Sequence, residues 1–316
     1  MSVTGVYRTA LRDLITSGGA EVLEEVRNIL EVTDRPGAVF YVDSVTGSDS
    51  NNGSSPGSPF ATLDYAIGQC TANKDDRIYV MAGHAESITA ASGITCDVAG
   101  ISIIGLGHGT VRPTFTWTAT ASTWVVSAAN VKIENIRCTV SIDEVVKLFS
   151  ASAAGLTLDK VDFFETASAQ AIQFLLTTAA CDDIVIKNCN HYQVTLAGGS
   201  QAWIQLIGCD RAQVIDNRFH LQLADVATSA VISNITTACL GVLIARNQIT
   251  MTGYTASLVS AILLNSGTTG NVSDNRIGTN TAANTTINVA AGCYSFNNLC
   301  TNVADTSGIL DPVADI

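Results

Sequence analysis

Charged residues are scarce in this 316-residue chain, at 14%, whereas hydrophobic residues make up 47%. A disordered chain would show the opposite balance, so this composition excludes one. Soluble globular domains usually carry about a quarter charged residues, and the deficit therefore needs a cause. Stacked flat strands rich in Thr, Ser, Asn and β-branched residues account for it.

Basic residues are few as well, and the formal net charge is -12. A phosphate-binding surface needs the opposite sign, so nucleic acid is not an expected partner. The chain lacks a run of about 18 apolar residues, so we expect no membrane span. Its first residues lack the apolar core of a signal peptide, and we expect synthesis in the cytoplasm without secretion.

The nine cysteines include no CxxC pair. A structural metal site needs several thiolates or imidazoles that converge with tetrahedral geometry, and cysteines spread at about one per repeat do not provide it. Without a secretion signal, we expect them to be reduced and buried. The sequence therefore predicts neither a metal nor a cofactor.

One short phrase recurs along the chain: two apolar residues at alternate positions, then a polar residue, then Asn or a substitute for it. A second apolar phrase precedes most copies, and no helical pattern separates them, which argues against a doubly wound α/β fold. The intervals of 23–30 residues fit one three-sided coil each. The sequence thus predicts an all-β, single-stranded right-handed parallel β-helix of about nine coils over residues 37–302. The copies end at positions 82, 105, 135, 160, 188, 217, 247, 275 and 298.

Asparagine ends six of these copies. Its backbone tolerates the left-handed conformation, and its side-chain amide bonds to nearby backbone. In coils stacked about 4.8 Å apart, amides can also bond to one another as a ladder. We interpret the six as a structural row along one corner: Asn135, Asn188, Asn217, Asn247, Asn275 and Asn298.

The residue before each corner should point outward, and from residue 159 onward these residues alternate in charge. Opposite charges on adjacent strands stabilise a pair by about 0.2–1 kcal/mol. A carboxylate between two cations has a lowered pKa and is a poor general acid, so we interpret the row as structural. The predicted charge ladder consists of Asp159, Lys187, Asp216, Arg246 and Asp274.

Residues 1–36 have a helical period instead of a strand period. The open end of a β-helix exposes core and strand edges, so this segment either caps that end or serves attachment or trimerisation. Residues 303–316 are expected to form a C-terminal cap or tail. The apolar positions of the N-terminal segment are Tyr7, Leu11, Leu14, Ile15, Val22, Leu23, Val26, Ile29 and Leu30.

The start of the β-helix is distinctive: Tyr41-Val42-Asp43 precedes a Gly/Asp/Asn-rich stretch at residues 47–53 and then Pro59-Phe60-Ala61-Thr62-Leu63. This arrangement resembles the opening of pectate-lyase-like β-helix proteins, among them bacteriophage virion surface proteins. The resemblance covers roughly residues 38–300 and concerns fold rather than activity. It implies a non-enzymatic virion structural protein, most simply a homotrimeric capsid decoration protein bound to other virion proteins. The alternative is a tail or head spike that binds or cleaves host surface polysaccharide.

Catalysis has to be weighed because many proteins of this fold cut polysaccharides as hydrolases or lyases. Hydrolysis usually needs two carboxylates about 5–10 Å apart on an exposed groove. Asp162 and Asp183 could approach each other across neighbouring coils, but the sequence offers neither an obvious supporting partner. Aromatic residues, common in sugar clefts, are only 6% of the chain. We therefore expect no catalytic residues, with Asp162 and Asp183 as weak candidates.

Overall fold

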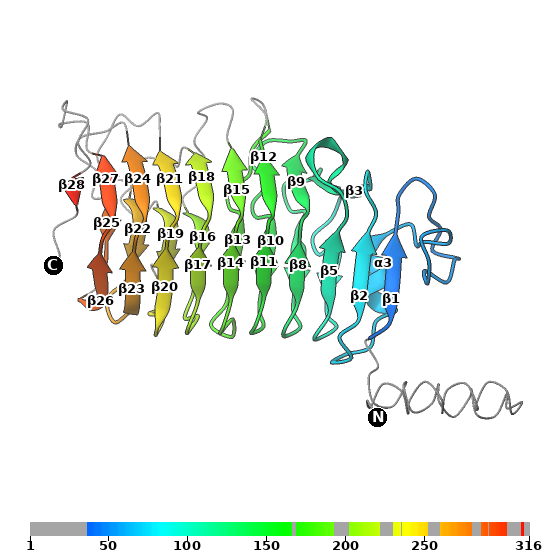
Figure 1. The fold of residues 1–316 in the computed structure, drawn as a ribbon, viewed down its shortest axis with the longest axis horizontal. Helices are drawn as coiled ribbons and strands as arrows, with labels where there is room; N and C mark the ends of the chain where they lie inside the picture. The colour runs from blue at the N-terminus through cyan, green and yellow to red at the C-terminus, as the bar shows by residue number, and fades with distance from the viewer. Residues whose placement is uncertain are drawn as a thin grey trace, which may run out of the picture. The chain divides into compact units, whose positions relative to one another are not determined.

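Three parallel sheets, here called A, B and C, run side by side through residues 38–316 (Figure 1). This computed structural model describes residues 37–165, 169–192, 202–221, 230–234, 236–251, 260–279, 286–289, 291–301 and 311–312. The helical segment expected over residues 1–36 lies outside the described residues, as does most of the expected C-terminal cap or tail.

Sheet A forms the lower row of strands in Figure 1. Its strands are β1 (Val39–Val42), β2 (Arg77–Val80), β5 (Ser102–Gly105), β8 (Lys132–Glu134), β11 (Thr157–Asp159), β14 (Val185–Lys187), β17 (Gln213–Ile215), β20 (Val242–Ala245), β23 (Thr269–Ser273) and β26 (Gly292–Phe296).

Sheet B forms the upper row. It contains β3 (Ala85–Ile88), β6 (Thr114–Trp117), β9 (Arg137–Val140), β12 (Asp162–Phe164), β15 (Asn190–Tyr192), β18 (Arg218–Leu221), β21 (Gln248–Met251), β24 (Arg276–Thr279), β27 (Leu299–Thr301) and β28 (Asp311–Pro312). The last of these pairs antiparallel with β27 at the end of the sheet.

Sheet C closes the coil. It contains β4 (Ile94–Cys96), β7 (Trp124–Val126), β10 (Phe149–Ala151), β13 (Leu175–Thr177), β16 (Ala202–Gln205), β19 (Ala230–Asn234), β22 (Ser260–Leu264) and β25 (Ile287–Asn288).

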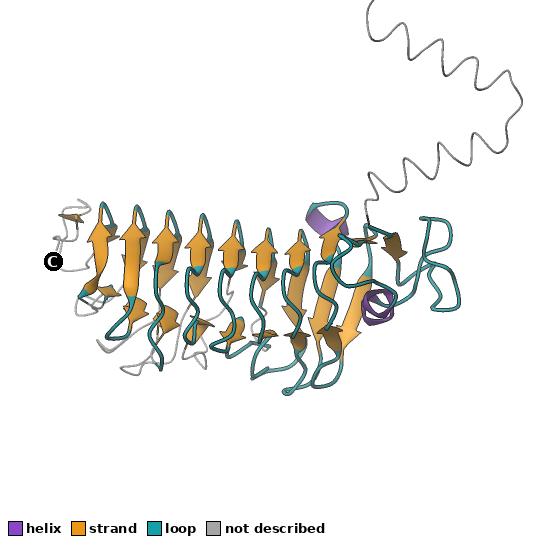
Figure 2. Cartoon of the chain, turned by 90° about the horizontal axis from the view of Figure 1, so that it is seen from below, coloured by secondary structure: helices purple, strands orange, loops and turns teal. Residues whose placement is uncertain are grey.

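From β2 onward the chain passes through sheets A, B and C in turn, with short loops at the corners (Figure 2). The predicted all-β parallel β-helix is therefore confirmed. Its size differs somewhat from the nine coils expected: sheet C has eight described strands, so eight turns have all three sides. A further turn consists of β26 and β27 only, among the described residues.

Alternation of inward and outward side chains explains why these residues form strands. In β2, β5, β6 and β9, burial alternates residue by residue, with the second and fourth residues inside. At the first end of the stack, helix α3 (Leu63–Gly68) contributes Leu63, Ala66 and Ile67 to the core. The short 3-10 helix η1 (Gly109–Val111) lies in the loop before β6.

From β8 onward, one left-handed residue per coil turns the corner between sheets A and B, and this position corrects the predicted asparagine row. Asn135 and Asn188 occupy it, with φ of 58° and 55°. Register places Ile215 beside Lys187, so Asp216, and not Asn217, is level with Asn188. The other four asparagines stand one residue later, buried inside the corner: Asn217, Asn247, Asn275 and Asn298.

The slip has a physical reason. Asparagine suits the left-handed turn and also suits a buried position where amides stack, so the sequence pattern does not distinguish the two positions. Only the four later asparagines form a continuous ladder. In it, the oxygen of each amide accepts bonds from the backbone N–H and side-chain amide of the asparagine one coil before, at 2.9–3.1 Å.

The predicted charge ladder is wrong at the same place, because Lys187 faces Ile215 rather than Asp216. Two separate pairs remain. Lys187 lies 3.5 Å from Asp159, whose side chain is buried at the register position of Glu134 and Lys187. Arg246 donates two hydrogen bonds of 2.7 and 2.8 Å to Asp216. Asp274 accepts a hydrogen bond from Asn297 in the following coil.

Candidate functional site

The two weak catalytic candidates do not meet. Asp183 lies in the turn before β14, whereas Asp162 begins β12 beyond the opposite end of the sheet A strands. Each also has a basic partner that the sequence did not reveal. Arg211, one coil on, binds Asp183 with two bonds of 2.6 and 2.8 Å, and this hydrogen bonding lowers the pKa of the carboxyl.

Asp162 forms an ion pair with Arg112 and accepts a hydrogen bond of 2.9 Å from the Asn190 amide. Each carboxylate is thus held by an arginine, and the two lie at opposite ends of the sheet A strands. The pair therefore lacks the arrangement that glycoside hydrolysis requires.

A different arrangement appears on the outer face of sheet B, where strand pairing aligns outward residues into two rows. The first row is polar, and its residues follow one another along the stack in this order: Arg137, Asp162, Asn190, Arg218, Gln248 and Arg276. The second row lies two residues further along each strand: Thr139, Phe164, Tyr192, His220 and Thr250.

Aromatic rings lie together in the middle of the second row. Phe164 is 38% exposed and Tyr192 is 52% exposed, large fractions for apolar rings. The Tyr192 and His220 rings stack with centroids 5.2 Å apart, and the Arg137 guanidinium carbon lies 4.9 Å above the Phe164 ring. These three residues, Phe164, Tyr192 and His220, are called the aromatic row below.

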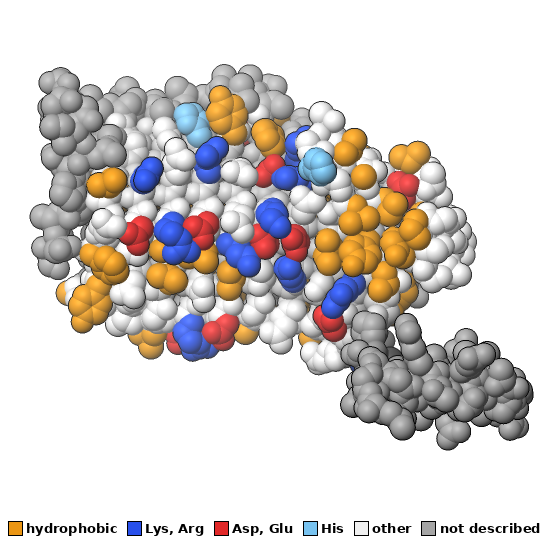
Figure 3. Space-filling model, viewed as in Figure 1, with side chains coloured by type: hydrophobic (Ala, Val, Ile, Leu, Met, Phe, Trp, Pro, Cys, Tyr) orange, Lys and Arg blue, Asp and Glu red, His pale blue; other side chains and the backbone are white. Residues whose placement is uncertain are grey.

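Charge on this face has the opposite sign to that of the whole chain. Arg112, Arg137, Arg218 and Arg276 lie on or beside the polar row, and Asp162 is its one carboxylate among the described residues. Figure 3 shows basic side chains over the sheet B strands, beside histidine and hydrophobic side chains. The face therefore carries local positive charge on a chain of net charge -12.

The aromatic content of the sequence did not indicate the aromatic row, because composition averages over the whole chain. A positional signal existed. Phe164, Tyr192 and His220 each stand four residues after the left-handed corner residue of their coil, which is Lys160, Asn188 and Asp216 respectively.

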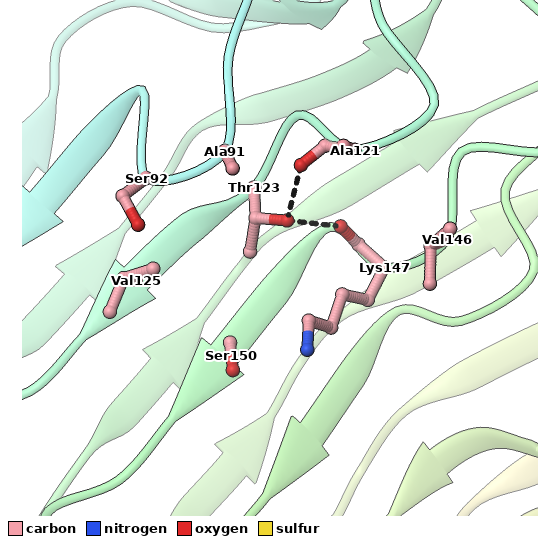
Figure 4. Close-up of a pocket in the computed structure, with 8 residues that line it drawn as sticks. All are labelled: Ala91, Ser92, Ala121, Thr123, Val125, Val146, Lys147 and Ser150. Atoms are coloured by element: carbon pink, nitrogen blue, oxygen red, sulfur yellow. Dashed lines mark hydrogen bonds between the residues drawn. The ribbon is translucent and has the colours of Figure 1, made fainter.

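A second feature is a shallow hollow of about 350 Å³ beside the first strands of sheet C. Thr123 stands inside it and donates to the Ala121 and Lys147 carbonyls at 3.1 and 3.5 Å (Figure 4). Its lining contains hydroxyls and one cation but no carboxylate or imidazole, so it has no acid-base pair. The lining residues are Ala91, Ser92, Ala121, Thr123, Val125, Val146, Lys147 and Ser150.

Within the described part of the chain, His, Cys, Asp and Glu side chains form no group of three or more suited to a metal ion. The same described residues contain no helix of the length and apolarity that a membrane crossing requires. Eight of the nine cysteines are buried, and Cys70 is half-buried.

Comparison with known proteins finds no matching family model and no matching curated protein. Solved structures do match. A rhamnogalacturonan lyase aligns with a TM-score of 0.43 and 14% identity, over 77% of this chain and 74% of its own. A GH136 lacto-N-biosidase from Eubacterium ramulus aligns with a TM-score of 0.42 and 11% identity, over 89% of this chain and 70% of its own. The likeness is one of fold.

Proposed function

We propose that this chain binds an extended anionic polysaccharide along the outer face of sheet B and does not cleave it. The observation that carries the proposal is the alignment of the aromatic row beside the arginine-rich polar row. Aromatic faces pack against the apolar C–H faces of sugar rings. Guanidinium groups bind carboxylate or sulfate in a bidentate manner, so the two rows together match an acidic sugar chain.

The spacing of the rows supports a polymer rather than a small molecule. Successive coils place equivalent side chains about 4.8 Å apart, in a straight line along the stack. A linear chain with repeated charged groups can contact several rungs at once, and each further contact is intramolecular and therefore adds avidity. A rigid solenoid suits such binding because its side chains are already in position.

The carboxylates argue for binding without hydrolysis. Asp162, the carboxylate on this face, is engaged by Arg112 and Asn190, and Asp183 lies elsewhere beside Arg211. The virion setting, the capsid decoration role and the homotrimer implied by the sequence resemblance stay predictions. Light scattering tests the trimer, and electron microscopy of particles that carry the protein tests the setting.

Binding to alginate, polygalacturonate and chondroitin sulfate, with neutral dextran for comparison, tests the proposal. We expect the full chain to bind at least one anionic polymer in low salt and to lose affinity as salt rises. Tyr192→Ala should weaken binding about tenfold, in line with about 1–3 kcal/mol for a stacking contact.

Tyr294→Ala is the matched control, because Tyr294 is 75% exposed on sheet A, away from the two rows. It should leave affinity unchanged. Equal losses in both variants, equal affinity for dextran, or no binding to any of the anionic polymers would overturn the proposal.

A further inference from the structure

Two ionisable side chains are buried directly beneath the aromatic row. His191 precedes Tyr192 on β15 and points into the core, where its ring stacks on Trp203 with centroids 4.0 Å apart. Glu165 follows β12, and its carboxylate oxygen Oε2 lies 3.5 Å from His191 Nε2. Both side chains are 2% exposed.

The pair is poorly satisfied. The Glu165 oxygen Oε1 accepts the Ala171 N–H at 2.9 Å, but Oε2 and both imidazole nitrogens of His191 have no hydrogen-bond partner within normal geometry. Buried polar groups are nearly always bonded, so an exception at this depth points to a role other than stability.

The neighbouring elements offer His191 no other buried charge among the described residues. From β12 it meets Glu165 and the Phe163 ring, and from β18 it meets Phe219, with His220 on the outer side. Asp162 and Arg218 start these two strands on the outer face. The nearby thiols of Cys138 and Cys189 are neutral, because burial raises the pKa of both, that of Cys189 to about 12.

We infer that the Glu165–His191 pair makes polysaccharide binding on sheet B sensitive to acid, by loosening β15 and with it Tyr192 when His191 takes up a proton. This inference rests on the proposed function for its binding consequence only. While the His191 imidazole is neutral, β15 stays packed. A proton on the imidazole places a charge among Phe163, Trp203 and Phe219, which favours opening of the strand.

The direction of the effect follows from the folded state. Burial lowers the pKa of His191 below 6.5. The packed strand therefore resists protonation while the open strand accepts it, so opening becomes easier as pH falls below about 6.5.

Amide hydrogen exchange of residues 190–192 in the full chain tests this without any ligand. After correction for intrinsic rates, we expect protection to fall at least tenfold from pH 7.5 to pH 5.0 in the wild type. The double variant Glu165→Gln/His191→Phe should show no such fall, because neither of the two substituted side chains can ionise. Glu165→Gln alone keeps His191 and the acceptor for Ala171, and should retain the acid loss.

Binding of chondroitin sulfate, whose sulfates stay ionised at pH 5.0, gives the second readout. Affinity of the wild type should fall over the same interval, and affinity of the double variant should not fall.

The two proposals fail separately. Acid-dependent exchange without binding of any anionic polymer would sink the binding proposal alone. Exchange at residues 190–192 that is equal at both pH values in the wild type would overturn the acid-sensitive pair. A fall in protection that persists undiminished in the double variant would overturn it as well.

Discussion

The first coils and the last coils fill the same inner corner between sheets A and B with different chemistry. In the first coils the residue after the left-handed turn is apolar or a thiol: Ile136, Val161 and Cys189, all buried. In the last coils it is Asn217, Asn247, Asn275 or Asn298, also buried but bonded from coil to coil. The boundary is sharp, because Asn217 accepts the Cys189 N–H at 2.9 Å and begins the ladder.

The core follows the same division. Large rings lie inside the first coils and contact one another there, whereas the largest fully buried side chains include no ring after Phe219 among the described residues. Apolar burial stabilises in proportion to area but tolerates small shifts. A chain of amides bonds well in one register only. The stability of the first coils therefore depends on the volume of their buried side chains, and that of the last coils depends on the register of their asparagines.

The largest expected effect is at the centre of the amide ladder. Asn247→Ala removes the acceptor for the Asn217 backbone and side-chain donors and leaves the Val214 carbonyl without its 2.8 Å bond. Unsatisfied buried groups cost about 1–3 kcal/mol each, so we expect a loss of about 2–4 kcal/mol in urea unfolding.

Asn188→Gly is the matched control for that variant, because Asn188 is exposed in the left-handed position and glycine adopts that conformation readily. It loses one hydrogen bond, the 2.8 Å bond that the Asn188 amide donates to Asp159, so its free energy of unfolding should fall by about 1 kcal/mol or less. Comparable losses at residues 188 and 247 would remove the distinction between the two asparagine positions.

The converse substitution, Val161→Asn, places an amide at the same inner corner of a first coil. Its neighbours in that row are Ile136 and Cys189, whose side chains offer no amide to complete a ladder. We expect a loss of about 1–3 kcal/mol for a buried amide without good partners, measured by thermal or urea unfolding. A variant as stable as the wild type would show that the first coils accept the chemistry of the last ones.

The smallest effect concerns the outer corner. Hydrogen bonds from Arg246 lower the pKa of Asp216 below 3.8, so the pair contributes stability above that pH and loses it as pH falls through the lowered pKa. Both side chains are well exposed, and solvent limits the contribution to about 0.2–1 kcal/mol. Asp216→Asn should flatten the pH dependence of unfolding between pH 5 and pH 2; an unchanged slope would show that the ion pair has no effect on stability.

The repeat itself could be predicted because apolar residues at alternate positions mark the buried side of the strands, as in the strands that contain Ile133 and Ile186. The register of Asn217 could not, since asparagine fits both the turn and the ladder. The partners of Asp162 and Asp183 could not either, because Arg112 and Arg211 come from other coils and their reach depends on loop conformation.

The aromatic row could not be predicted either, because its outward direction depends on the register of each strand. Phe164, Tyr192 and His220 are separated by 28 residues each, and nothing local distinguishes them from core residues such as Phe163 and Phe219. The outward direction follows from counting along a strand whose start is fixed by the corner. A one-residue error in that start exchanges the inner and outer faces.

Because each coil pairs only with the coils before and after it, the two rows on sheet B can change in length only by whole coils. Duplication of one coil would extend the polar and aromatic rows by one rung of about 4.8 Å without altering the rungs already present. Deletion would shorten them by the same step. The length of a ligand that could contact such a face would therefore change in steps of one coil, independently of the affinity of each coil for the ligand.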